Sequence, residues 1–97
     1  MNKKTYIVKP ETEELLIKQK RLSYRSHNRG MKETDVLLGR FADRYLSEFD
    51  ERKLSLYEAL LQESDPDILS WITGTSEIPL KQVNEVTDLL CKFFDYE

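Results

Sequence analysis

Apolar residues recur every three to four positions between residues 36 and 46, and this spacing constrains the fold more than any other feature. They are Val36, Leu37, Phe41, Tyr45 and Leu46. Side chains at this spacing share one face of an α-helix, which is then buried against a core. We therefore predict a helix over about 31–49, with Glu33 and Asp35 in its first turns, where the helix dipole favours acids.

Four other segments carry helical signals, at about 10–27, 51–62, 66–73 and 80–94. With the helix over 31–49, five helices are predicted. Their expected inward residues are Leu15, Leu16, Leu22 and Tyr24; Leu54, Tyr57, Leu60 and Leu61; Ile68, Leu69, Trp71 and Ile72; and Val83, Val86, Leu89, Leu90 and Phe93. Only three glycines and three prolines occur in 97 residues, which disfavours a turn-rich β fold. We predict an all-α fold: a single-domain bundle of five short helices over residues 11–97, preceded by a flexible tail over residues 1–10.

Polar and small residues at the segment boundaries predict where helices begin and end. Thr12 or Thr5 is expected to precede the first helix, and Asp50 is expected to cap the helix that follows it. In the run Ser64-Asp65-Pro66-Asp67, Asp65 is expected to be the cap, and Gly74 ends that helix. Gly39, inside a helix, predicts a close crossing of two helices near Ala42.

Charge is divided unevenly along the chain, whose formal net charge is −3. Residues 1–32 hold nine Lys/Arg and three acidic residues, whereas residues 33–97 hold six and fifteen. The first helix is therefore expected to present a basic face, and with the next helix it superficially resembles a helix-turn-helix. Because the second helix is acidic and DNA phosphates repel acidic groups, nucleic-acid binding is the weakest of the alternatives.

His27 and Cys91 are the single histidine and the single cysteine of the chain, and they lie far apart in it. Metal sites need closely spaced ligands, and nucleophilic catalysis needs a base within reach. We expect His27 to be an exposed helix-end residue and Cys91 to be a buried thiol. The chain is predicted not to be an enzyme, with no catalytic and no metal-binding residues.

A single cysteine cannot form an internal disulfide, which suits a reducing compartment. No apolar run approaches the roughly 20 residues needed to span a bilayer, and no apolar signal-peptide region follows the N-terminal lysines. These features predict a cytoplasmic protein that does not insert into a membrane.

Residues 29–33 interrupt the helical pattern and form the strongest candidate site. Gly30 permits a positive φ or a close backbone approach, and the turn is expected to bring Arg29 near Glu33. From the residues alone, this corner is either a solvated ion pair between two helix ends or a recognition point for a partner.

Two stretches of the sequence resemble the succinate dehydrogenase assembly factor family. The first, residues 21–42, contains the family's Arg-Gly-x-x-Glu motif as Arg29, Gly30 and Glu33. The second, residues 64–71, resembles the family's Asp-Pro-Asp-Leu-x-x-Trp segment, with Ile68 in place of the leucine. The resemblance covers about residues 14–94.

Members of this family promote covalent flavinylation of the flavoprotein subunit of succinate dehydrogenase. The resemblance therefore implies a transient complex with that subunit, with the fumarate reductase flavoprotein as a second candidate client. It implies a bacterial cytoplasmic protein, or a mitochondrial-matrix protein in eukaryotic relatives. It also implies a monomer that binds no cofactor stably, because the FAD is attached to the client.

By position, the resemblance assigns partner binding to Arg29, Gly30 and Glu33, with Arg25, Met31 and Asp35 as weaker candidates. Because the flavin supplies its own electrophile, a helper need only hold the client in an aligned conformation. Arg29 would offer its planar fork to a client carboxylate or carbonyl, and Glu33 would pair with a client cation or orient Arg29. The alternative is a general helical regulator that binds some other protein through the same corner.

Overall fold

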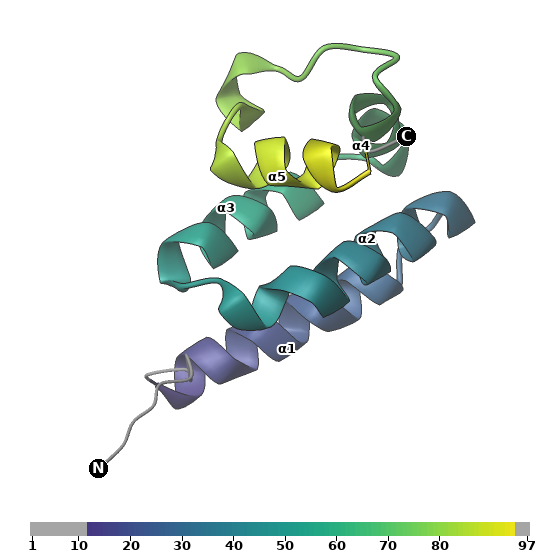
Figure 1. Cartoon of the computed structure of the whole chain (residues 1–97). Coiled ribbons are helices and arrows are strands. Elements are labelled where there is room, and N and C mark those ends of the chain that lie inside the picture. Colours follow the sequence, from purple (N-terminus) through teal and green to yellow (C-terminus); the bar gives the residue numbers. More distant parts are fainter. Residues whose placement is uncertain (1–11, 95–97) are drawn as a thin grey trace.

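The computed structural model describes residues 12–94, in which five α-helices follow one another along the chain (Figure 1). They are α1 (Glu13–His27), α2 (Lys32–Tyr45), α3 (Glu51–Leu61), α4 (Asp65–Thr73) and α5 (Glu85–Phe93), with short 3-10 turns at Leu46–Glu48 and Leu80–Gln82. No strand occurs between residues 12 and 94, so the predicted all-α fold is confirmed. The predicted tail over residues 1–10 lies outside the described residues.

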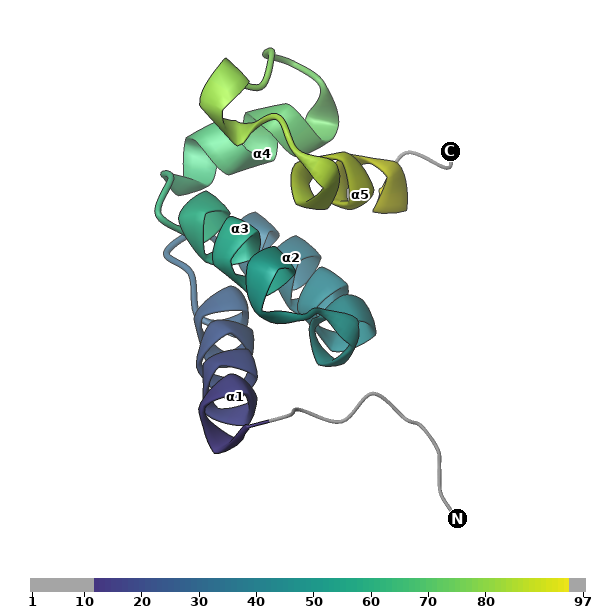
Figure 2. The ribbon, with the colours of Figure 1, turned by 90° about the vertical axis from the view of Figure 1, so that its left-hand side faces the viewer.

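The helices α1 and α2 form an antiparallel hairpin, and α3 lies between this hairpin and the pair α4 and α5 (Figure 1, Figure 2). All five helices contribute fully or almost fully buried side chains to one core, among them Leu22, Leu38, Phe41, Leu54, Tyr57, Leu60, Ile68 and Leu90. Figure 2 also shows that the turn joining α1 to α2 lies beside the turn joining α3 to α4. The fold therefore brings residues 28–31 next to residues 62–65.

Several predicted helix boundaries are confirmed by hydrogen bonds. The Oγ1 atom of Thr12 accepts the N–H of Leu15 at 3.0 Å, and Oδ1 of Asp50 accepts the N–H of Lys53 at 2.9 Å. Gly74 ends α4 with a φ of 78°, a left-handed conformation that glycine adopts without steric cost. These local signals placed the start of α3 and the end of α4, whereas α1, predicted from about residue 10, begins at Glu13 after the Thr12 cap.

The predicted cap of α4 was wrong. Ser64, rather than Asp65, is the cap, because its Oγ accepts the N–H of Asp67 at 3.3 Å. Asp65 is instead the first residue of the helix, and its carboxylate points toward the turn between α1 and α2.

Two predicted helices were too long. The segment predicted over 31–49 leaves the α-helical geometry after Tyr45 and continues as the 3-10 turn. The segment predicted over 80–94 is interrupted at Asn84, because Oδ1 of this residue accepts the N–H groups of Val86 and Thr87 at 2.8 and 3.1 Å. In return, Oγ1 of Thr87 accepts the N–H of Asn84, and this reciprocal capping box starts α5 at Glu85.

The inward faces were predicted correctly for α3 and only in part elsewhere. All four residues predicted for α3 are buried: Leu54, Tyr57, Leu60 and Leu61. In α2 the buried stripe includes Leu38, which was not predicted, whereas Val36 is 47% exposed. Leu16, Tyr24 and Val83 are also exposed. The spacing fixed the helical period, but contact with two neighbouring helices decided which face of α2 is buried.

Gly39 lies at a close crossing of α1 and α2, as predicted. A Cβ atom at this position would lie 2.6 Å from Nδ1 of His27, which is closer than nonbonded atoms approach. The His27 side chain is exposed, as predicted, and its Nε2 lies 2.9 Å from Oδ1 of Asp43. Cys91 is half-buried rather than buried, with its Sγ 3.7 Å from the carbonyl oxygen of Trp71.

Candidate protein-interaction site

The guanidinium of Arg29 points from the turn between α1 and α2 into the turn between α3 and α4. Its Nε donates to Oδ1 of Asp65 at 2.7 Å, and its Nη1 and Nη2 donate to the carbonyl oxygens of Leu61 and Glu63, each at 2.9 Å. Only 11% of each of the Arg29 and Asp65 side chains is exposed. The guanidinium therefore satisfies carbonyls at the end of α3 and neutralises a carboxylate in the first turn of α4.

Asp65 holds the opposite side of the turn. Its Oδ2 accepts the N–H of Met31 at 2.9 Å. Burial alone would raise the pKa of Asp65, but the hydrogen bonds from Arg29 and Met31 and the positive charge of Arg29 outweigh burial and hold the pKa below its usual value. The carboxylate therefore stays ionised in the folded protein at neutral pH.

The first turn of α2 fixes the backbone of the corner from a third direction. The carboxylate of Asp35 accepts the N–H of Arg29, and Oγ1 of Thr34 donates to the carbonyl oxygen of Met31 at 2.9 Å. Both the side chain and the backbone of Arg29 are thus held by groups of the chain itself. The result is a polar corner whose shape is set by contacts within the chain.

The structure corrects the predicted pairing of Arg29 with Glu33. Within residues 12–94, Arg29 forms its ion pair with Asp65, and Glu33 has neither an ion pair nor a side-chain hydrogen bond. Three of the five N–H donors of the guanidinium are used internally, so its fork is not presented to a client. Glu33 is exposed on the first turn of α2 and has an unused carboxylate.

Gly30 does not adopt the positive φ that the sequence allowed; between residues 12 and 94 only Gly74 has such a glycine conformation. It is exposed, and a Cβ atom added there would lie 3.4 Å from Oδ2 of Asp65, an ordinary van der Waals contact. The chain itself therefore does not need glycine for backbone geometry at this position. A close approach of another backbone to Gly30 stays a prediction.

A surface hollow of about 340 Å³ opens beside this corner, lined by Arg25, Asn28, Arg29, Gly30 and Asp65. The fold therefore gathers three of the predicted residues, Arg25, Arg29 and Gly30, at one hollow. Met31 and Asp35 are half-buried beneath the corner, and their roles in the structure are the backbone contacts described above.

Asp65 is the residue of this site that the sequence did not reveal. It was interpreted as a helix cap, and its distance of 36 residues from Arg29 hid the pairing. One signal was available: the Ser64-Asp65-Pro66-Asp67 run contains more capping groups than one helix start can use. Ser64 fills that role, which leaves the Asp65 carboxylate available for Arg29.

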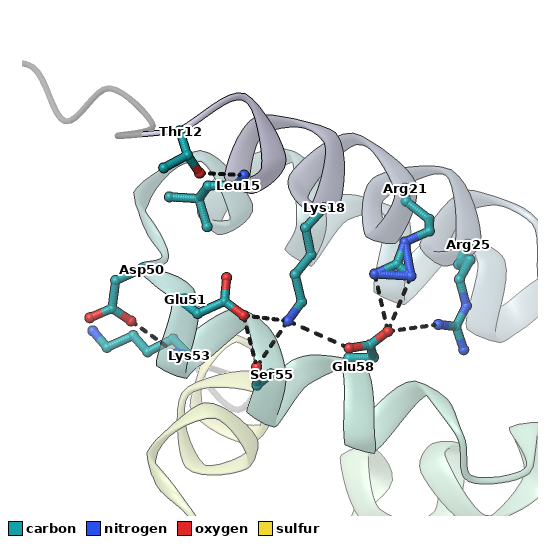
Figure 3. Close-up of polar contacts among 10 residues, drawn as sticks. All are labelled: Thr12, Leu15, Lys18, Arg21, Arg25, Asp50, Glu51, Lys53, Ser55 and Glu58. Carbon is teal, nitrogen blue, oxygen red and sulfur yellow. Dashed lines mark hydrogen bonds and ion pairs between the residues drawn. The ribbon is translucent and has the colours of Figure 1, made fainter.

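The basic face predicted for α1 is largely neutralised by α3. Figure 3 shows Lys18, Arg21 and Arg25 reaching toward Glu51 and Glu58. Lys18 Nζ lies 2.7 Å from Glu51, and the Arg21 guanidinium lies 3.2 Å from Glu58. Because Lys18 and Arg21 already have close acidic partners, they are poorly placed to neutralise phosphates, which argues against the nucleic-acid alternative.

Within residues 12–94, no group of three or more His, Cys, Asp or Glu residues is arranged to hold a metal ion. In the same part of the chain, none of the helices combines the length and apolar character required to cross a bilayer.

Comparison with known proteins shows the family to which the chain belongs. A family model described as flavinator of succinate dehydrogenase matches residues 20–94, and the chain belongs to this family. It is 46% identical over 71 residues to a protein of Scheffersomyces stipitis, covering 73% of this chain and 48% of the relative. It is 43% identical over 72 residues to one of Dictyostelium discoideum, with coverages of 74% and 51%.

A third relative, from Danio rerio, is 43% identical over 83 residues, covering 84% of this chain and 52% of the relative. All three relatives are named succinate dehydrogenase assembly factor 2, mitochondrial. The chain spans about half the length of the curated relatives it matches.

Proposed function

We propose that this chain binds the flavoprotein subunit of succinate dehydrogenase and promotes the covalent attachment of FAD to it. Family membership supports this proposal. The observation that carries it is the internal clamp between Arg29 and Asp65, which leaves Gly30 and Glu33 exposed on a corner of fixed shape. A preformed surface of this kind loses little conformational entropy when it docks.

The chain acts on the client through binding rather than by supplying a reacting group. The flavin brings its own electrophile: a ring methyl group gives up a proton, a nitrogen of a client histidine bonds to that methyl carbon and loses its own proton, and the flavin ring takes up the electron pair and both protons as it is reduced. A helper that binds the conformation in which flavin and histidine are aligned raises the population of that conformation and hence the rate.

Each residue of the corner has a role in this proposal. Arg29 positions the turn through Asp65 and the α3 carbonyls instead of touching the client. Gly30 lets the client backbone approach closely, and Glu33 pairs with a client cation. Arg25, whose side chain is 31% exposed at the rim of the hollow, is available to a client carboxylate despite its 3.9 Å contact with Glu58.

The experiment combines the purified chain with the apo flavoprotein subunit and FAD, and follows covalent flavin as fluorescence of the denatured flavoprotein band. We expect faster attachment with the wild-type chain and at least tenfold slower attachment with Glu33→Ala. The matched control is Glu77→Ala, because Glu77 is also exposed and has no ion pair within residues 12–94. If the wild-type chain neither accelerates attachment nor forms a complex with the flavoprotein subunit, the proposal is overturned and a regulator of some other protein is favoured.

Three further experiments test the other predictions from the resemblance. Replacing the client by the fumarate reductase flavoprotein tests the second client. Sedimentation of the chain alone and with the client tests whether it is a monomer and binds transiently. The intracellular location stays a prediction, tested by fractionation of cells that express the chain.

A further inference from the structure

The outer face of α2 continues the exposed corner along the helix. Glu33, Val36 and Arg40 recur at positions i, i+3 and i+7, so they lie on one face. All three are exposed, and Val36 is one of the large apolar side chains that the fold leaves in solvent, at 47% exposure. An acidic group, an apolar group and a basic group thus follow one another on one side of α2.

Within residues 12–94, neither Glu33 nor Arg40 has an ion-pair partner. In the same range, two of the other charged side chains of α2 do have one, whereas Lys32, exposed next to Glu33, does not. Asp43 contacts His27, and Arg44 pairs with Glu48 at 2.9 Å. The unpaired charges at the two ends of this face are therefore available to a partner that carries the opposite charges.

A hollow of about 290 Å³ lies along this face, between α2 and the end of α1. It is lined by His27, Asp35, Val36, Gly39, Arg40 and Asp43. Gly39 has no side chain, and a Cβ atom there would lie only 2.6 Å from Nδ1 of the His27 ring. The His27 ring therefore occupies the space over Gly39, and the hollow beside it is bordered by Val36 and Arg40.

We propose that the face formed by Glu33, Val36 and Arg40 is a second docking surface that continues the corner, and that it receives a segment of the flavoprotein subunit. The segment carries an apolar side chain over Val36, a basic group toward Glu33 and an acidic group toward Arg40. Seven residues of helix separate the two charges by about 10 Å, which sets the spacing of the partner's groups. This inference rests on the proposed function, because it takes the flavoprotein as the occupant.

The test measures the dissociation constant of the whole chain for the apo flavoprotein subunit. Arg40→Glu and Val36→Gln are each expected to weaken binding at least tenfold. Their matched controls are Lys92→Glu, an exposed lysine of α5, and Leu80→Gln, at an apolar side chain that is 89% exposed. Both controls are expected to bind within twofold of wild type, and circular dichroism and urea unfolding check that every variant is folded.

A photo-crosslinking side chain at position 36 provides an independent readout, with position 80 as its control. We expect crosslinks to the flavoprotein from position 36 alone, in a peptide that contains both an acidic and a basic residue. Wild-type affinity in Arg40→Glu and Val36→Gln, together with weak binding by Glu33→Ala, would overturn this inference and leave the proposed function standing. Absence of binding by the wild-type chain would overturn both.

Discussion

The Nε atom of Arg29 lies 2.7 Å from Oδ1 of Asp65, and this contact joins the turn between α1 and α2 to the first turn of α4. The two residues are 36 positions apart, and both side chains are largely buried. The pair therefore determines the shape of the corner, and Gly30 and Glu33 beside it are exposed.

Removing the Asp65 carboxylate leaves the charge of Arg29 largely buried without its counterion. We expect Asp65→Ala to lower the free energy of unfolding by about 2–3 kcal/mol, between the values typical of exposed and fully buried pairs. Urea denaturation measures this change. Asp67→Ala is the control, since it alters another acid of the same helix turn and should cost less than about 1 kcal/mol. Equal effects of the two substitutions would mean that the pair does not hold the corner.

The same carboxylate makes stability depend on pH. The pKa of Asp65 is lower in the folded protein than its usual value of 3.8. Its contribution is therefore fully present above the unfolded pKa and is lost as the pH falls through the folded pKa. In unfolding measurements from about pH 6 to about pH 2, Asp65→Asn should show a shallower loss of stability below about pH 4 than wild type. Parallel curves for the two proteins would contradict the lowered pKa.

Tyr57 carries a buried hydroxyl, whose oxygen lies 2.6 Å from Oγ of Ser26. Burial raises its pKa to about 12, with the hydrogen bond to Ser26 acting in the opposite direction. The raised pKa contributes stability below the unfolded value near 10, and this contribution is lost as the pH rises through about 12.

Ultraviolet titration of phenolate formation should therefore show one tyrosine that ionises only at the highest pH or on unfolding, and Tyr57→Phe should remove it. The substitution should also cost about 1 kcal/mol of unfolding free energy, because Ser26 loses one partner. Tyr24→Phe is the control, since Tyr24 is 68% exposed. An ordinary titration curve for Tyr57 would be inconsistent with its burial.

Gly39→Ala has two opposing effects on the free energy of unfolding, one from helix propensity and one from a steric clash. Alanine is better than glycine in a helix interior by about 1 kcal/mol, but its Cβ would lie 2.6 Å from Nδ1 of His27. We expect the gain to be lost in the wild-type background and to appear in the His27→Ala background. A double-mutant cycle on unfolding free energies measures the difference. Additive effects would show that the two residues do not contact each other.

Much of the fold followed from local signals in the sequence. The caps at Thr12 and Asp50, the stop at Gly74 and the apolar stripe of α3 each depend on a few neighbouring residues. The interruption at Asn84 was also readable, because an asparagine followed by Thr87 three residues later can form a capping box. The interruption was not predicted because apolar residues at helical spacing continue on both sides of Asn84.

The arrangement of the site was less accessible, because it depends on contacts between distant segments. The sequence identified Arg29, Gly30 and Glu33 as a group, but it paired Arg29 with the nearest acid. In the folded chain, the crossing of the hairpin with α3 brings Asp65 closer in space than Glu33. The burial of Leu38 in place of Val36 has the same origin, since only the packed neighbours determine which side of α2 is covered.

The role of the exposed corner is best tested by the initial rate of covalent FAD attachment to the apo flavoprotein subunit, measured with the wild-type chain, Glu33→Ala and Glu77→Ala. We expect acceleration by wild type and Glu77→Ala, and its loss in Glu33→Ala while the unfolding free energy of that variant stays within about 0.5 kcal/mol of wild type. Full acceleration by a folded Glu33→Ala would contradict the assignment of this corner as the docking site.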